Sequence, residues 1–211
     1  MSDYLDITGL INNLIPNDLG DLKLPDPDLL AFYRNYGQRK IYIFGEIDSS
    51  LSQDTQSILN YNVEDANIPP EERKPIIVYI NSPGGDLTAT YQFISVCEAS
   101  KTPIITVNMG MAYSGGGLVL LAGHKRYALK RTQAMIHQGS GVIQGSYDQI
   151  NESQKSYKKD IEEMKKYVLE RTKIDEKTFN KNKTKDWYFD SDEQLQNGIV
   201  DAIVTSLDEI I

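Results

Sequence analysis

Residues 108–117 read NMGMAYSGGG, and they join an apolar, β-branched run at 104–107 to a second apolar run at 118–122. A serine between glycines at a strand-to-helix turn has little bulk around it. Its hydroxyl can therefore reach a substrate, while neighbouring backbone N–H groups point at the atom under attack. This pattern makes Ser114 a candidate nucleophile. Glycines at such a turn also permit tight packing or positive backbone angles, so a structural role stays open on this stretch alone.

Outward from this stretch, predicted strands alternate with predicted helices. The run at 76–80 is almost continuously β-branched, as in strands buried on both faces of a parallel sheet. The alternation predicts an α/β domain with parallel strands and right-handed crossovers, whose functional loops lie at the carboxyl ends of the strands. The predicted strands are 40–44, 76–80, 104–107 and 134–136, and the predicted helices are 26–36, 50–61, 88–99, the segment after Ser114, and 146–172.

Composition bounds the class of protein. The 211 residues are 40% apolar and 25% charged, which suits one domain, and we divide the chain into an N-terminal arm, 1–25, and a single domain, 26–211. A net charge of −8 argues against a nucleic-acid partner. The start of the chain has no secretory signal pattern, and no apolar run approaches the ~18 residues of a membrane span. We therefore expect a soluble, cytoplasmic protein with no membrane partner.

A second glycine-rich stretch, NSPGGD at 81–86, follows the predicted strand 76–80. We expect a tight loop whose bare backbone either offers N–H groups to a developing oxyanion or simply turns the chain. Because Ser114 follows the neighbouring strand, both loops should open at the same edge of the sheet.

A serine nucleophile needs a base, and the chain has two histidines. His124 lies in the sequence GHKR, which we predict to be a solvated charged turn whose positive neighbours oppose protonation of the imidazole. His137 ends the strand 134–136 and precedes another glycine loop, 138–141. His137 is thus the better candidate base, with an ordinary surface or core histidine as the alternative.

The sequence pattern says less about an orienting carboxylate, the single cysteine, and metal or cofactor sites. A carboxylate to orient the imidazole cannot be chosen among several downstream candidates. Cys97 sits in a helical pattern and is predicted to be a small core residue. Neither histidine belongs to a metal-ligand cluster, and no phosphate-binding glycine motif is present, so we expect no metal and no cofactor bound by this chain. The candidate carboxylates are Asp148, Asp186, Asp190, Asp192 and Asp201.

Four motifs in order resemble those of the proteolytic subunit of the Clp protease family, within the wider Clp/crotonase fold. They are YINSPGG at 79–85, the glycine-flanked serine at 110–117, MIHQ at 135–138 with the later Gly145, and residues 186–204. The resemblance covers 40–204 and implies a fold of repeated β-β-α units with parallel strands. By position it implies that Ser114 is the nucleophile, His137 the general base and Asp186 the acid, with the backbone N–H groups of Gly85 and Gly115 as oxyanion donors.

The resemblance also implies an activity and partners. The family hydrolyses unfolded polypeptides through an acyl-enzyme, inside two stacked heptameric rings, and an AAA+ unfoldase uses ATP to feed them. Tyr113 before the serine, Gly115 after it and Gly139 after the His-Gln pair depart from the family pattern. They indicate a divergent member, such as a phage-encoded or paralogous copy, and bear on the side-chain preference of its pocket.

A long polar helix is predicted from the capping-box sequence at 146–149 to about Thr172, roughly 40 Å at 1.5 Å per residue. Its narrow apolar stripe either packs on its own domain or, as the resemblance implies, acts as a protruding handle that interlocks the two rings. Ser191 is expected to cap a further helix that ends near Gly198. The stripe consists of Ile150, Tyr157, Ile161, Met164 and Val168.

Two alternatives come from other classes. A crotonase-type acyl-CoA enzyme would share the fold and the oxyanion loops without needing the serine and histidine pair. A non-catalytic or regulatory ring subunit would be expected to have lost a triad position, whereas all three positions match here.

Overall fold

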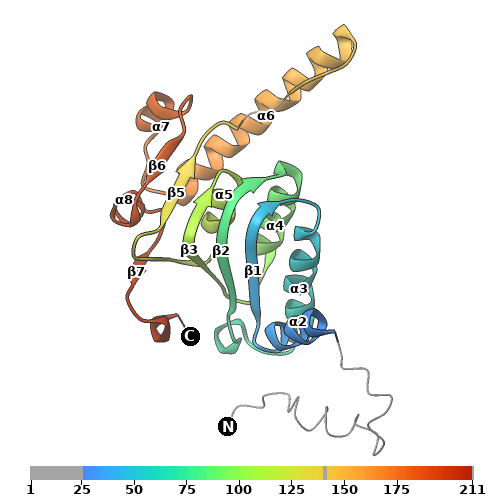
Figure 1. Ribbon diagram of the computed structural model, residues 1–211, viewed down its shortest axis with the longest axis vertical. Helices are drawn as coiled ribbons and strands as arrows, with labels where there is room; N and C mark the ends of the chain where they lie inside the picture. Colours follow the sequence, from blue (N-terminus) through green and yellow to red (C-terminus); the bar gives the residue numbers. More distant parts are fainter. Residues whose placement is uncertain (1–25, 140–141, 211) are drawn as a thin grey trace, which may run out of the picture.

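The computed structural model describes residues 26–139 and 142–210, which form a seven-stranded sheet flanked by helices (Figure 1). The predicted arm, 1–25, lies outside the described residues. The strands are β1 (Lys40–Ile47), β2 (Ile76–Gly85), β3 (Ile104–Tyr113), β4 (Lys125–Leu129), β5 (Gln133–Ile136), β6 (Trp187–Phe189) and β7 (Ala202–Val204). The helices are α2 (Pro27–Gly37), α3 (Leu51–Glu64), α4 (Leu87–Ala99), α5 (Gly115–Leu121), α6 (Tyr147–Arg171), α7 (Glu176–Asn182) and α8 (Ser191–Gln196), with short 3₁₀ turns η2 (Pro70–Glu72) and η3 (Leu207–Glu209).

The sheet follows the order β1-β2-β3-β4-β7, and every pairing along this path is parallel. The predicted α/β class with parallel strands is therefore confirmed. Strand β3 is long enough to pair twice: its first half pairs with β4 and its second half, from Met111 to Tyr113, pairs in parallel with β5. Strand β6 then adds to β5 in the antiparallel direction. The short strands β5 and β6 therefore extend the sheet beside the carboxyl-terminal half of β3.

Buried apolar side chains form one cluster on each face of the sheet. In β2 the alternation is clear, because Ile76, Val78 and Ile80 join the large cluster with α3, α4, α5 and α6, whereas Ile77 and Tyr79 join a smaller cluster on the other face. Cys97 is fully buried in the large cluster, as predicted, and burial raises the pKa of its thiol.

Strands β1, β2 and β3 extend well beyond their predicted ends. Strand β1 does not end at Gly45 but passes through it, with a positive φ of 84° and a bulge in the register, before continuing to Ile47. The tight loop predicted at 81–86 is wrong, because β2 stays extended and pairs Ser82 with Ala112 and Gly84 with Glu46. Gly84 and Gly85 therefore allow neighbouring backbones to approach closely and do not form a turn.

The charged stretch after Gly123 is a strand rather than the predicted turn. Lys125 and Arg126 begin β4, where they pair with Ile105 and Thr106. The prediction also misplaced one cap by a residue, since Asp190 rather than Ser191 accepts the backbone N–H of Glu193 at the start of α8.

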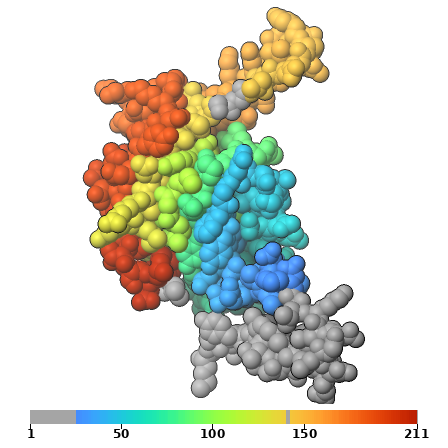
Figure 2. Space-filling view, in the orientation of Figure 1, coloured from blue at the N-terminus to red at the C-terminus, as the bar shows by residue number. Residues whose placement is uncertain are grey.

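Helix α6 is 25 residues long and begins with the predicted capping box between Ser146 and Gln149. Its amino-terminal half projects beyond the rest of the chain (Figures 1 and 2). Near its other end, Met164, Tyr167 and Val168 are buried in the large cluster. The apolar stripe thus packs partly on its own domain. Within the two described ranges, no helix has both the length and the apolarity to cross a membrane.

Candidate active site

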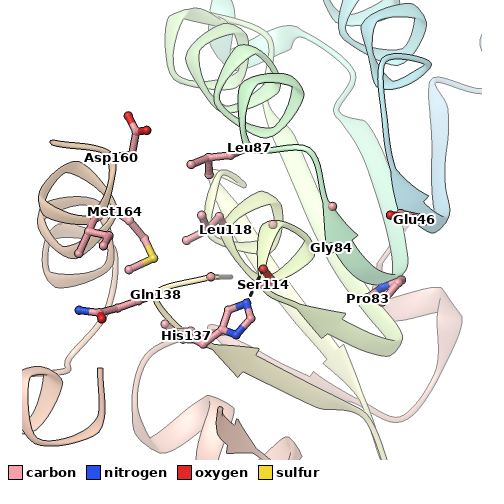
Figure 3. Close-up of a pocket in the computed structure, with 15 residues that line it drawn as sticks. Glu46, Pro83, Gly84, Leu87, Ser114, Leu118, His137, Gln138, Asp160 and Met164 are labelled. Atoms are coloured by element: carbon pink, nitrogen blue, oxygen red, sulfur yellow. Dashed lines mark hydrogen bonds between the residues drawn. The ribbon is translucent and has the colours of Figure 1, made fainter. Parts of the chain in front are cut away.

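Ser114 lies in the junction between two regular elements. Strand β3 ends at Tyr113 and α5 begins at Gly115, and between them Ser114 has φ 52° and ψ −120°, a conformation that residues with side chains rarely adopt. Two bonds fix this turn: the Ser114 N–H donates to the Met135 carbonyl at 2.9 Å, and its own carbonyl accepts from the Leu118 N–H at 3.1 Å. The hydroxyl consequently faces a cleft beside the sheet edge (Figure 3).

His137 and Asp186 complete a hydrogen-bonded row with this serine. The Nε2 atom of His137 lies 2.8 Å from Ser114 Oγ, and its Nδ1 atom lies 2.9 Å from Asp186 Oδ1. When Nδ1 carries the proton it donates to the carboxylate, which leaves Nε2 free to accept from the serine hydroxyl. The structure therefore brings together Ser114 and His137, which the sequence pattern singled out, and Asp186, which the family resemblance implied.

Strand register explains why this aspartate meets this histidine. The antiparallel ladder of β5 and β6 pairs Met135 with Tyr188 and Ile136 with Trp187, so the next position along each strand aligns His137 with Asp186. Packing holds β6 in place, since Phe189 is buried in the large apolar cluster and Trp187 packs against that cluster. Because residues opposite each other in a ladder project to the same face, the two side chains meet without a special loop.

The other downstream carboxylates have different positions. Asp190 caps α8, and Asp201 forms an ion pair with Arg126 at 2.9 Å. Asp148 and Asp192 lie in the first turns of α6 and α8, where acids favour the positive helix end. Asp186 is itself open to solvent, with 59% of its side chain exposed against 21% for His137.

His124 lies away from this row. Its Nδ1 atom accepts the backbone N–H of Ile104 at 3.0 Å, so the ring caps the start of β3. The predicted opposition to protonation is present, but its causes differ from the expected ones. Burial is the largest influence that lowers the pKa of His124, and the charge of Arg171 comes second.

Bare glycine backbone packs against the serine turn. A side-chain carbon added to Gly84 would lie 2.6 Å from the Tyr113 carbonyl and 2.8 Å from Ser114 Cβ, and the positive φ of 92° favours glycine as well. A carbon added to Gly115 would come within 3.5 Å of the Gly85 nitrogen. The two backbones predicted to supply oxyanion donors thus lie side by side next to the serine.

The cleft in front of Ser114 has a volume of about 480 Å³. One wall is apolar and comes from α4, α5 and α6, whereas the mouth is polar (Figure 3). The apolar wall consists of Leu87, Leu118, Ile161 and Met164. The charged or titratable residues that line the cleft are Glu46, His137 and Asp160.

Sequence reasoning did not identify this wall. Ile161 and Met164 were recognised only as part of the helical stripe, and no local signal indicates that α6 returns across the serine. Among residues 26–139 and 142–210, no three His, Cys, Asp or Glu side chains come together as a metal site would require.

Comparison with known proteins gives the family. The Clp protease family model matches residues 30–207. The chain belongs to the Clp protease family. The resemblance inferred from the four motifs is thereby confirmed, and the family places the chain among the serine-type endopeptidases, which are hydrolases.

Individual Clp relatives match most of the chain. The ATP-dependent Clp protease proteolytic subunit 2 of Bacillus licheniformis is 32% identical over 176 residues, covering 82% of this chain and 90% of that protein. The proteolytic subunit 1 of Bacillus cereus is 31% identical over 195 residues, covering 91% and 98%. The proteolytic subunit 2 of Treponema denticola is 29% identical over 176 residues, covering 82% and 84%.

Proposed function

We propose that this chain is a catalytically active Clp-type proteolytic subunit that cleaves peptide bonds of unfolded polypeptides through a Ser-His-Asp triad. The observation that carries the proposal is the continuous hydrogen-bonded row from Ser114 through His137 to Asp186, at 2.8 and 2.9 Å, facing a cleft. In hydrolases, nucleophile, base and orienting carboxylate are recognised by such geometry rather than by chain order.

In the proposed reaction, His137 removes the proton of Ser114 as the hydroxyl attacks the peptide carbonyl. The imidazolium then returns that proton to the leaving amine, and an acyl-enzyme remains on Ser114. Water, activated by the same imidazole, releases the acyl group. Asp186 holds the Nδ1–H tautomer and stabilises the charged ring.

The backbone N–H groups of Gly85 and Gly115 are the proposed donors to the oxyanion. Gly115 is the first residue of α5, and the first N–H groups of a helix have no acceptor within the helix. The close approach of the Gly85 nitrogen to Gly115 supports a shared site for one oxygen atom. Donors fixed before the reaction stabilise developing charge without reorganising.

The two alternatives have less support. A non-catalytic ring subunit gives no reason to keep Ser114 in a strained backbone conformation beside a hydrogen-bonded imidazole. The family match is to Clp proteases rather than to acyl-CoA enzymes.

The relatives are named as subunits of ATP-dependent proteases, and we extend this to the chain as part of the proposal. It would act in the cytoplasm, in two stacked heptameric rings, with an AAA+ unfoldase that supplies ATP-driven unfolding. The projecting half of α6 is the proposed contact between rings, because Tyr147 is 79% exposed there and Ile150 is half-buried. Replacing both residues by aspartate should give single rings or smaller species in analytical ultracentrifugation, whereas Ser156→Asp, at an exposed polar position on another face of the helix, should not.

Labelling with a fluorophosphonate probe tests the catalytic part of the proposal directly. The probe should modify the assembled wild-type protein at Ser114, as located by peptide mapping, and should not modify Ser114→Ala. His137→Ala should slow the labelling strongly, because the hydroxyl loses its base. An assembled wild-type ring that carries no label at Ser114 would overturn the proposal in favour of a scaffold role.

A further inference from the structure

The cleft combines an apolar wall with acidic ends. Leu118 lies beside Ser114, Met164 faces it from α6, and Asp160 lies one helical turn beyond Met164 on the same side of that helix (Figure 3). Glu46 lies at the other side of the cleft, past Pro83 and Gly84. Among the described residues that line the cleft, none is a lysine or an arginine.

The backbone of Asp160 is held in place, and its carboxylate has no ion-pair partner among the described residues. The Tyr91 hydroxyl, from α4, donates to the Asp160 backbone carbonyl at 3.2 Å and fixes this turn of α6 against the domain. Among the described residues, no cation lies within ion-pair distance of the Asp160 carboxylate. A carboxylate without an ion pair, carried by a fixed turn of helix at the end of an apolar wall, can bind a cation.

We propose that Asp160 determines substrate specificity by accepting the cationic end of a lysine or arginine side chain at the residue whose carbonyl Ser114 attacks. This inference rests on the proposed peptidase function. The methylene stem of such a side chain would pack along Leu118 and Met164, and its charged end would meet Asp160 at the more polar rim. Long basic side chains commonly divide between apolar and polar surroundings in this way.

Charge also predicts what the cleft rejects. With Glu46 and Asp160 as its two carboxylates, an aspartate or glutamate at this substrate position would face like charge without a compensating cation. Unbranched apolar side chains should still be accepted, because they can pack against the same apolar wall. The distinctive property is therefore the advantage of a cationic side chain over a neutral one of the same length.

A pair of fluorogenic peptides measures that advantage directly. They are identical except for lysine or norleucine at the cleaved position, since norleucine keeps the stem without the ammonium group. Both are assayed on the same preparation, so the ratio of their kcat/KM values does not depend on the fraction of protein that is assembled. The wild type should favour lysine, and Asp160→Asn should lower the lysine-to-norleucine ratio about five- to tenfold, the scale of a partly exposed charged contact.

Two controls separate a local effect from a general one. Glu162→Gln removes the same charge from an exposed position of α6 and should leave the ratio unchanged. Raising the salt concentration should reduce the ratio in the wild type and have little effect in Asp160→Asn. A ratio that is unaltered in Asp160→Asn while norleucine is still cleaved would overturn the specificity proposal alone. Failure of the wild type to cleave either peptide, with Ser114 unlabelled, would instead overturn the proposed function and with it this inference.

Discussion

The two histidines of this chain lie at opposite ends of the parallel strands of one sheet. His124 precedes β4 and accepts a backbone N–H at the start of β3, whereas His137 follows β5 and its ring contacts the side chains of Ser114 and Asp186. At the amino edge, strands begin with N–H groups that need acceptors, so a neutral imidazole serves as a cap. At the carboxyl ends of β3 and β5, the residues that follow the two strands, Ser114 and His137, meet each other, and Asp186, which precedes the antiparallel β6, meets His137. Position relative to the strand ends, rather than residue type, separates a structural histidine from the proposed base.

Among the substitutions that test this comparison of the two histidines, removal of the proposed nucleophile or base should have the largest effect on activity. Ser114→Ala and His137→Ala should each lower kcat for peptide hydrolysis by about 10⁴- to 10⁶-fold, with little further loss in the double variant, because these groups act as a unit. Steady-state assays with burst-phase controls measure the three values. His124→Ala should retain activity within a few fold when assembled. Additive losses at the carboxyl edge would contradict the shared mechanism.

Asp186→Asn tests the outer member of the row. The amide can present its N–H₂ group to Nδ1 and so favour the wrong tautomer of His137, and we expect a loss in kcat of about 10²- to 10⁴-fold with the fold intact. The matched control is Asp190→Asn, because asparagine caps a helix about as well as aspartate. Near-normal turnover in Asp186→Asn, measured beside a circular dichroism spectrum, would assign the role to another carboxylate.

Gly84→Ala should disturb the serine turn through packing. The added carbon would overlap the Tyr113 carbonyl and Ser114 Cβ at a positive φ, which we expect to cost about 2–4 kcal/mol in the free energy of unfolding and to reduce probe labelling of Ser114. Urea unfolding gives the stability. Gly37→Ala is the control, since a carbon there meets open space in a helix and should leave stability unchanged or slightly higher.

Tyr157→Phe should have a smaller effect on the proposed base. The Tyr157 hydroxyl donates to the Gln138 carbonyl at 2.9 Å, which ties α6 to the residue after His137. Losing one such bond costs about 1 kcal/mol, so we expect kcat to fall about three- to tenfold with unchanged sedimentation. A drop in KM alone, or altered assembly without a change in kcat, would show that this tyrosine does not position the base.

His124→Asn should give the smallest change, and it appears only in the pH dependence of stability. Because the pKa of His124 is lowered in the folded protein, the unfolded chain binds its proton more readily. Its contribution is present above the unfolded pKa near 6.5 and is lost as the pH falls below that value. Asparagine keeps an acceptor without titrating, so unfolding measured from pH 5 to 7.5 should depend less on pH. The ring is partly exposed, and the difference should stay below about 1 kcal/mol. Identical slopes would contradict the capping role.

The α/β class with parallel strands was predictable, because strands that alternate with helices along the chain leave few possible arrangements. Ser114 and His137 were predictable for the same reason, since each directly follows an apolar strand. Local physics alone could not select Asp186, because its meeting with His137 depends on the register of a three-residue strand, β6, that carries no alternation of its own. The resemblance to the Clp family provided that residue.

Other features depended on contacts that local sequence does not encode. The loop predicted at 81–86 is an extended strand because neighbouring backbones supply hydrogen bonds that outweigh the turn preference of Pro83 and Gly84. The charged start of β4 was missed because Arg126 is paired by Asp201, 75 positions later. The cleft wall was missed because it needs the return of α6 over the sheet edge.

The ladder between β5 and β6 has an evolutionary consequence. His137 and Asp186 are 49 positions apart, yet the register of two short strands alone sets their meeting. A single-residue insertion inside either strand would turn one side chain to the opposite face. Insertions in the projecting turns of α6, before Tyr157, would leave the pair where it is. Lineages can therefore lengthen, shorten or exchange that projection, the proposed contact between rings, while inheriting the same arrangement of His137 and Asp186.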